Sequence, residues 1–269
     1  MSEPVSRRVA VGCLLLFVVP AGAPIPESPG LPADVRGLLG DGQVVVRGRN
    51  SVVVGRRRGS LDDLARRADL AGRRVAAVFG GPVRAVVVVP ASAEEAAGLA
   101  RVGRVDGLAA VADGGRVIVV PEYFGRLSSV GKDVVLAHEL THVVAGTERL
   151  PVWLYEGVAD YVGYRESGLP VKVAAAELAA EVRGGRLPRE LPGPAAFAAD
   201  GRDPVRLARA YQEAWMACRF LAHRFGEGTL VRLYRDARAV GVDQALAALG
   251  LSVATLTARW RDYVREQLG

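Results

Sequence analysis

Three side chains whose spacing suits metal chemistry lie close together in the chain. His138, Glu139 and His142 form the pattern His-Glu-x-x-His. In a helix, residues four apart share one face with Cβ atoms roughly 5–6 Å apart, so both imidazoles can reach one ion at a Zn–N distance of about 2.0–2.1 Å. Glu139 would lie beside that ion, where its carboxylate can take a proton from a water that the ion acidifies. This spacing is typical of zinc-dependent hydrolases.

The residues around this pattern favour a metal site over a coincidence. They are mostly apolar and compatible with a helix, and two of the three histidines of the chain lie in the pattern. Burying a histidine and a glutamate in an apolar helix is costly unless they are paired or bind a metal. We therefore expect a bound ion, and a degenerate pattern without metal is the alternative.

A catalytic zinc site needs a third protein ligand and leaves the fourth position to water. Glu156 fits best, because Pro151 suits the first turn of a new helix and the thirteen residues after His142 leave room for a turn and a returning helix. Glu148 is a weaker candidate, at the position where the metzincin pattern has histidine. Asp160, one turn beyond Glu156, could accept the second ring N–H of a ligating histidine. Alternatively, both acids form the solvated face of an amphipathic helix.

The histidine motif and the segment Pro-Val-Trp-Leu-Tyr-Glu-Gly-Val-Ala-Asp-Tyr at 151–161 together resemble the gluzincin metallopeptidases, particularly the bacterial peptidase MA-like group. The resemblance covers roughly residues 115 to 269. It implies one Zn²⁺ ion held by His138, His142 and Glu156, with Glu139 as the general base. No Gly-x-Met-Glu-Asn segment is present, so the resemblance does not extend to aminopeptidase activity.

Hydrophobic patterning predicts an α+β fold. A small N-terminal α/β part (residues 35–125) is expected to lead through an edge strand into a mostly helical, zincin-like catalytic part (residues 126–269). Strands are expected at 43–46, 51–54 and 83–89, and a hairpin around Gly114-Gly115 with its second strand at 116–120. Expected helices cover 61–79, 92–100, 131–145, 152–164, 171–183, 204–224, 228–238, 242–249 and 253–267.

The sequence also predicts residues that would contact a substrate. The strand at 116–120 directly precedes the histidine helix, where gluzincins keep an edge strand, and an edge strand can pair with an extended peptide. We expect Val117, Ile118 and Val119 to form the upper wall of the cleft. Tyr211 lies in a downstream helix that in these proteins runs near the cleft, so it could donate a hydrogen bond to an oxyanion. Core packing explains Tyr211 equally well.

The first residues have the pattern of an export signal. Arg7 and Arg8 precede an apolar run at 9–19, and small residues at 21–23 offer a cleavage site. We expect a signal peptide at 1–23, or an anchor if it is not cleaved, followed by a proline-rich linker at 24–34. A buried N-terminal helix is the alternative. Export would place the protein outside the cytoplasmic membrane, secreted or in the cell envelope, with Cys218 as the remaining, inert cysteine.

The hydrophobic content and the charge distribution of the chain limit the kinds of partner that it can bind. The chain has 269 residues, half of them hydrophobic, and a net charge of +6, so it can bury a full core. A basic cluster comprises Arg47, Arg49 and residues 56–58, but it lacks the interleaved aromatic residues that stack on bases. We expect a peptide or protein substrate, no nucleic acid, and membrane contact only through an uncleaved leader; the oligomeric state stays open.

The expected function is that of an exported zinc-dependent peptidase. The alternative is a non-catalytic cell-envelope module in which the ion joins two helices. Glu148 or His223 completing a closed shell of four protein ligands would favour that alternative.

Overall fold

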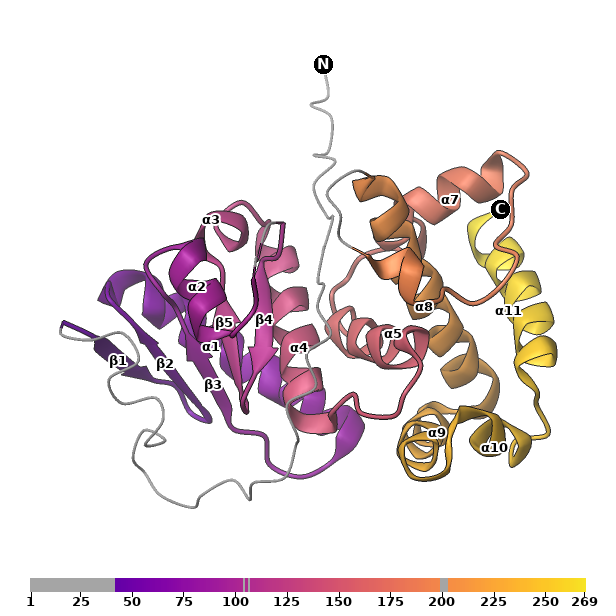
Figure 1. The fold of residues 1–269 in the computed structure, drawn as a ribbon, viewed down its shortest axis with the longest axis horizontal. Helices are drawn as coiled ribbons and strands as arrows, with labels where there is room; N and C mark the ends of the chain where they lie inside the picture. Colours follow the sequence, from indigo (N-terminus) through magenta and orange to yellow (C-terminus); the bar gives the residue numbers. More distant parts are fainter. Residues whose placement is uncertain (1–41, 104, 106, 199–202) are drawn as a thin grey trace.

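A five-stranded mixed sheet forms the N-terminal part of the fold (Figure 1). The computed structural model describes residues 42–103, 105, 107–198 and 203–269. The strands are β1 (Val44–Arg47), β2 (Ser51–Gly55), β3 (Ala85–Val88), β4 (Ala110–Asp113) and β5 (Arg116–Val119), in the order β1-β2-β3-β5-β4. The β2/β3 and β3/β5 pairs are parallel, and the outer pairs β1/β2 and β4/β5 are antiparallel.

Helices cover both faces of this sheet (Figure 1). Side chains alternate between the two faces of a strand, so Val53, Val87 and Val117 pack toward helices α1 (Arg58–Phe79) and α4 (Ser129–Ala145). Their neighbours Val52 and Ile118 pack toward helix α2 (Ala93–Leu99) on the opposite face. Burial on both faces explains why the strands are runs of valine rather than an apolar–polar alternation.

The expectation that residues 116–120 form an edge strand is wrong. Strand β5 lies between β3 and β4, and Val117 has Val87 as its partner on one side and Ala112 on the other. Val117, Ile118 and Val119 are only 1%, 0% and 2% exposed. They therefore cannot pair with an extended peptide. The edge position belongs to β4, because the Gly114-Gly115 turn folds β4 onto the outer side of β5.

Helix α4 joins the sheet to the helical remainder. A short helix, α3 (Pro121–Phe124), precedes it, and α5 (Val152–Gly163) follows. Helix α5 packs between α4 and the long helix α8 (Pro204–Phe225). The other elements are α6 (Val171–Ala174), α7 (Ala176–Arg183), the 3₁₀ helix Pro194–Phe197, α9 (Glu227–Val240), α10 (Val242–Ala247) and α11 (Val253–Leu268).

One hydrophobic core runs through both parts of the chain. It includes Leu61 and Val75 of α1, Leu140 of α4 and Trp260 of α11. The expected α+β class, with a small N-terminal sheet and a mostly helical remainder, is confirmed. One expected helix, at 171–183, is divided into α6 and α7 at Ala175, whose φ of −109° and ψ of 43° are not helical.

The expected signal peptide at 1–23 and linker at 24–34 lie outside the described residues. Among the helices of the described part, none combines the length and the hydropathy needed to cross a bilayer. Cys218 is a free thiol in the core, and burial raises its pKa well above the usual range.

Candidate metal centre

Helices α4 and α5 bring together three side chains that can hold a metal ion: His138, His142 and Glu156. The His138 Nε2 atom lies 3.0 Å from His142 Nε2 and 3.0 Å from Glu156 Oε2. The His142 Nε2 atom lies 3.4 Å from the same carboxylate oxygen. Three ligand atoms from two helices thus converge on one point.

These distances fit a tetrahedral ion. With metal–ligand bonds of about 2.0–2.1 Å, the ligand atoms of a tetrahedral site lie about 3.3–3.4 Å apart. The Glu156 Oε2 atom is buried, and among the described residues it faces two imidazole nitrogens without a hydrogen bond of good geometry, which is costly for a carboxylate oxygen unless a cation neutralises it. The geometry and this unsatisfied oxygen both indicate a cation site.

Asp160 orients the first histidine. Its Oδ1 atom lies 2.8 Å from Nδ1 of His138, one helical turn beyond Glu156. A carboxylate can only accept this hydrogen bond, so Nδ1 carries a proton, and Nε2 is the nitrogen that can bind an ion once the ring is neutral. Asp160 therefore lies where a residue that supports a metal ligand is expected.

The local electrostatics favour positive charge at this point. Burial alone would lower the pKa of His138, but the carboxylates of Asp160 and Glu156 outweigh burial and raise that pKa well above its ordinary value. Burial opposes ionisation of Glu156 as well, yet His142 and His138 lower its pKa to about 2. Burial raises the pKa of Asp160, against the effect of His138. A bound cation would supply the charge that these groups favour.

Two glycines let α5 approach its neighbours closely. A Cβ atom on Gly157 would lie against the main chain of Ala214 and 2.7 Å from Sγ of Cys218 in α8. A Cβ atom on Gly163 would lie 3.0 Å from the carbonyl oxygen of Val134 in α4. Gly163 thus lets α5 approach α4, which carries the histidines, and Gly157 lets another side of α5 approach α8.

The two expected catalytic side chains lie near the ligand group. Glu139 follows His138 on α4 and is only 4% exposed. Tyr211 of α8 is buried, with its ring centroid 6.1 Å from that of His138 and 5.1 Å from that of Phe197. Tyr155, which no sequence motif singles out, has its ring edge-on to His142 at a centroid distance of 5.8 Å. Phe197 was missed because no local pattern predicts its 3₁₀ helix.

The weaker candidate ligands lie elsewhere. The Glu148 Oε2 atom is 2.7 Å from Nη2 of Arg238, so this carboxylate pairs with an arginine. His223 packs against Tyr263, with ring centroids 5.6 Å apart, and lies twelve residues after Tyr211, roughly 18 Å along the helix. Among the described residues, the group that could hold an ion therefore consists of three side chains. The His142 side chain is 12% exposed, against 0% for His138 and 9% for Glu156, and is the most accessible of the three.

The basic cluster expected from the sequence is divided in space. Arg47 lies opposite Val52 near the β1–β2 turn, whereas residues 56–58 follow Gly55 at the other end of the hairpin. The main-chain N–H of Arg49 is held by Asp69, and the Arg56 side chain pairs with Glu95. These arginines do not form one continuous patch.

No protein-family model matches the sequence, and a search of curated proteins finds no relative. A proposal for its function therefore rests on the residues of the chain itself.

Proposed function

We propose that this chain is a zinc-dependent peptidase. The observation that carries the proposal is the convergence of His138 Nε2, His142 Nε2 and Glu156 Oε2 within 3.0–3.4 Å of one another. Two imidazoles and one carboxylate are a ligand set of zinc peptidases, and catalytic zinc sites have three protein ligands rather than four. His142 is the most exposed of the three side chains, at 12%, so we place the approach of the substrate on its side.

The side chains have separate roles in this proposal. Zinc, when bound, supplies Lewis acidity that acidifies water and polarises a carbonyl group. Glu139 accepts the proton from the attacking water and delivers it to the leaving amine. Asp160 holds the ring of His138 in place. Tyr211, buried beside His138, donates a hydrogen bond to the oxygen of the tetrahedral intermediate.

Substrate main chain is best received by β4. No other described strand pairs with the outer side of β4, where Ala110 and Val111 are buried and Ala112 and Asp113 are half-buried. An extended peptide would add to this edge by main-chain hydrogen bonds, chiefly at its more accessible residues 112–113. Helix α4, which carries the two histidines, packs against both β4 and β5. Residues 110–113 thus replace residues 117–119 as the proposed wall of the cleft.

Replacing the general base tests the proposal. Glu139→Gln should keep its zinc and lower peptide turnover at least about a hundredfold, since general bases contribute about 10²–10⁴-fold. The measurements are zinc content after dialysis and cleavage of casein or a peptide library. Glu148→Gln is the matched control, because Glu148 pairs with Arg238 outside the ligand group. Parent-like turnover in Glu139→Gln would rule out this role.

One observation favours a second candidate, a cell-envelope module in which the ion only joins two helices. The ligands come from both α4 and α5, and His138 is completely buried. That function predicts a large fall in melting temperature with chelator and no hydrolysis of any peptide tested. We retain export as part of both proposals, and N-terminal sequencing of the mature protein would show whether residues 1–23 are removed.

A further inference from the structure

Helix α1 supplies no metal ligand, yet it packs against both helices that do. It packs more extensively against α4 than against α5, and Arg74 reaches Gly163 at the end of α5. We infer that Arg67 and Arg74 of α1 are positioning residues of the metal centre, which hold α4 and α5 at the separation that the three ligands need. This inference rests on the proposed function and concerns the same site.

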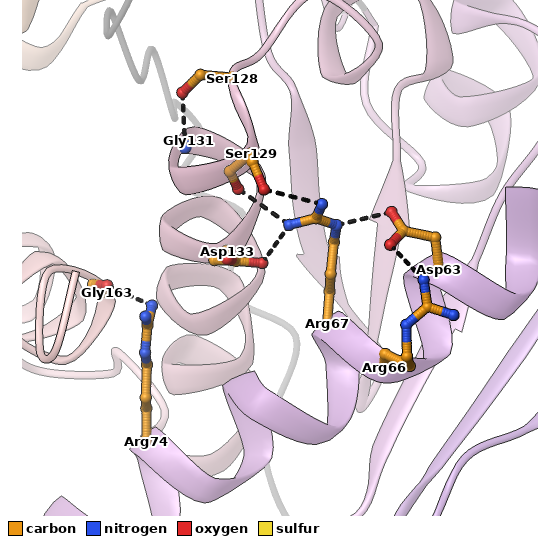
Figure 2. Close-up of polar contacts among 9 residues, drawn as sticks. All are labelled: Asp63, Arg66, Arg67, Arg74, Ser128, Ser129, Gly131, Asp133 and Gly163. Carbon is orange, nitrogen blue, oxygen red and sulfur yellow. Dashed lines mark hydrogen bonds and ion pairs between the residues drawn. The ribbon is translucent and has the colours of Figure 1, made fainter. Parts of the chain in front are cut away.

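Arg67 holds the first turn of α4 (Figure 2). Its Nη1 atom donates to the carbonyl oxygen of Ser129 at 3.0 Å and to Oδ1 of Asp133 at 2.6 Å. Its Nη2 atom donates to Oγ of Ser129 at 3.1 Å, and its Nε atom donates to Asp63 of α1 itself at 2.8 Å. One planar guanidinium group thus fixes the start of α4 from several directions.

Arg74 reaches the last turn of α5 (Figure 2). Its Nη1 atom donates to the carbonyl oxygen of Gly163 at 2.9 Å. The side chain is buried at 5% exposure, its Nε atom has no hydrogen-bond partner, and no carboxylate of the described chain lies within ion-pair distance of it. Its hydrogen-bond partner is a neutral carbonyl, and the carboxylates of Asp133 and Glu166 act on it only from beyond ion-pair distance, so its lost hydration is only partly compensated. Stability alone is therefore a weak reason for arginine at this position.

Both arginines act at the same end of the α4/α5 pair. They are seven residues apart, which places them on one face of α1 about 10 Å from each other along the axis. Helices α4 and α5, which carry the three candidate ligands, pack antiparallel. Glu156 lies near His142, Asp160 near His138, and Gly163 near Val134. Arg67 and Arg74 hold the α4/α5 pair at the end where Gly163 lies. Since ligands must be held within about 0.5 Å, release of this end should displace Glu156 from the imidazoles.

The test compares metal affinity with metal-free stability. We would measure the Kd for Zn²⁺ of the full chain by competition with a chromophoric chelator, and the visible spectrum of the Co²⁺ form. Arg67→Met and Arg74→Met should each raise the Kd about tenfold or more, as losses of supporting contacts do in other metal sites. Metal-free Arg74→Met should melt at or above the parent temperature, because a poorly compensated buried charge is removed.

Control variants separate positioning from general destabilisation. Arg66→Met lies on the same helix, and the partner of Arg66 is Asp63 of α1 rather than a residue of α4 or α5; its Kd should equal that of the parent. Leu61→Ala removes a buried side chain facing the sheet beside Gly55; it should melt at a lower temperature with unchanged Kd. Asp133→Asn removes the carboxylate that accepts from Arg67 and also acts on Arg74, so it should raise the Kd at least as much as Arg67→Met does.

Failure of the positioning role gives a different result from failure of the proposed function. If Arg67→Met and Arg74→Met bind Zn²⁺ with parent-like Kd, the positioning role is wrong and the proposed function is unaffected. If Leu61→Ala weakens Zn²⁺ binding as much as they do, affinity follows stability and the positioning role is also wrong. If the parent binds neither Zn²⁺ nor Co²⁺, the proposed function fails, and this inference fails with it.

Discussion

His138 is the residue on which the candidate site most depends, because both of its ring nitrogens are engaged. Nε2 faces His142 and Glu156, and Nδ1 faces Asp160, while the side chain is fully buried. A neutral imidazole can present only one lone pair, so the carboxylate of Asp160 decides which nitrogen is available to an ion. His142 has no such support, since its Nδ1 atom is buried without a hydrogen-bond partner.

Asp160→Asn tests this support. The amide has no charge and can turn its NH₂ group toward Nδ1, so the ring should be held less firmly and its Nε2 should be a weaker ligand. We expect the Kd for Zn²⁺ to rise about 10- to 100-fold, measured by chelator competition. Asp236→Asn, an exposed change on α9, is the control. Parent-like affinity in Asp160→Asn would mean that the hydrogen bond does not matter to the metal.

Glu213 of α8 should make stability fall with rising pH. Burial raises the pKa of its carboxyl from 4.5 to about 7, although Arg209 partly opposes this. Between these two values the unfolded chain has released the proton and the folded chain still holds it, so folding weakens as the pH rises through this window. The loss is on the order of 3 kcal/mol at about 1.4 kcal/mol per pKa unit.

Denaturant unfolding of the parent and of Glu213→Gln from pH 4 to pH 8 measures this effect. The glutamine at position 213 cannot ionise. As the pH rises, the unfolding free energy of the parent should therefore fall relative to that of the variant. A constant difference across the range would show that Glu213 titrates normally in the folded protein.

At the scale of elements, α5 depends on glycine where it crosses α8. Gly157→Ala would place a methyl group against the main chain of Ala214 and the thiol of Cys218. Overpacking of this kind costs about 1–3 kcal/mol, which should lower the melting temperature by several degrees and move Glu156. Gly228→Ala is the matched control, because a Cβ atom there meets nothing within 4 Å and alanine favours a helix. Equal melting temperatures for the two variants would contradict the close contact.

The ligand-bearing elements could be predicted because their signals are local. The apolar pattern around His138 and the proline at 151 indicated helices at 131–145 and 152–164, and α4 and α5 occupy Ser129–Ala145 and Val152–Gly163. Ligand spacing within one helix follows from helical geometry. The pairing of Glu156 with the two histidines needed only a short connection between adjacent helices.

The sheet edge could not be predicted in the same way. A hairpin at Gly114-Gly115 indicates that β4 and β5 pair, but it does not say which of the two also pairs with β3. That choice depends on contacts between β3 and β5, distant in sequence. The pairing of Glu148 with Arg238 depends on a tertiary contact in the same way. Strand order and side-chain partners of this kind need the folded structure.

At the scale of the whole molecule, the N-terminal sheet and the helical remainder serve one site. Helix α1 belongs to the sheet part, yet Arg67 and Arg74 contact α4 and α5. Helix α8 supports α5 from the opposite side and brings Tyr211 to His138. Helices α4 and α5 are therefore held between elements from both parts of the chain. The two parts share one hydrophobic core.

X-ray absorption of the zinc-loaded protein tests the central claim most directly. For the parent we predict one zinc ion per chain that survives dialysis, with four nitrogen or oxygen neighbours at about 2.0–2.2 Å and the outer-shell signal of two imidazoles. In His142→Ala that signal should fall to one imidazole. Zinc that is lost on dialysis of the parent, or a two-imidazole signal that persists in His142→Ala, would contradict a centre built from His138, His142 and Glu156.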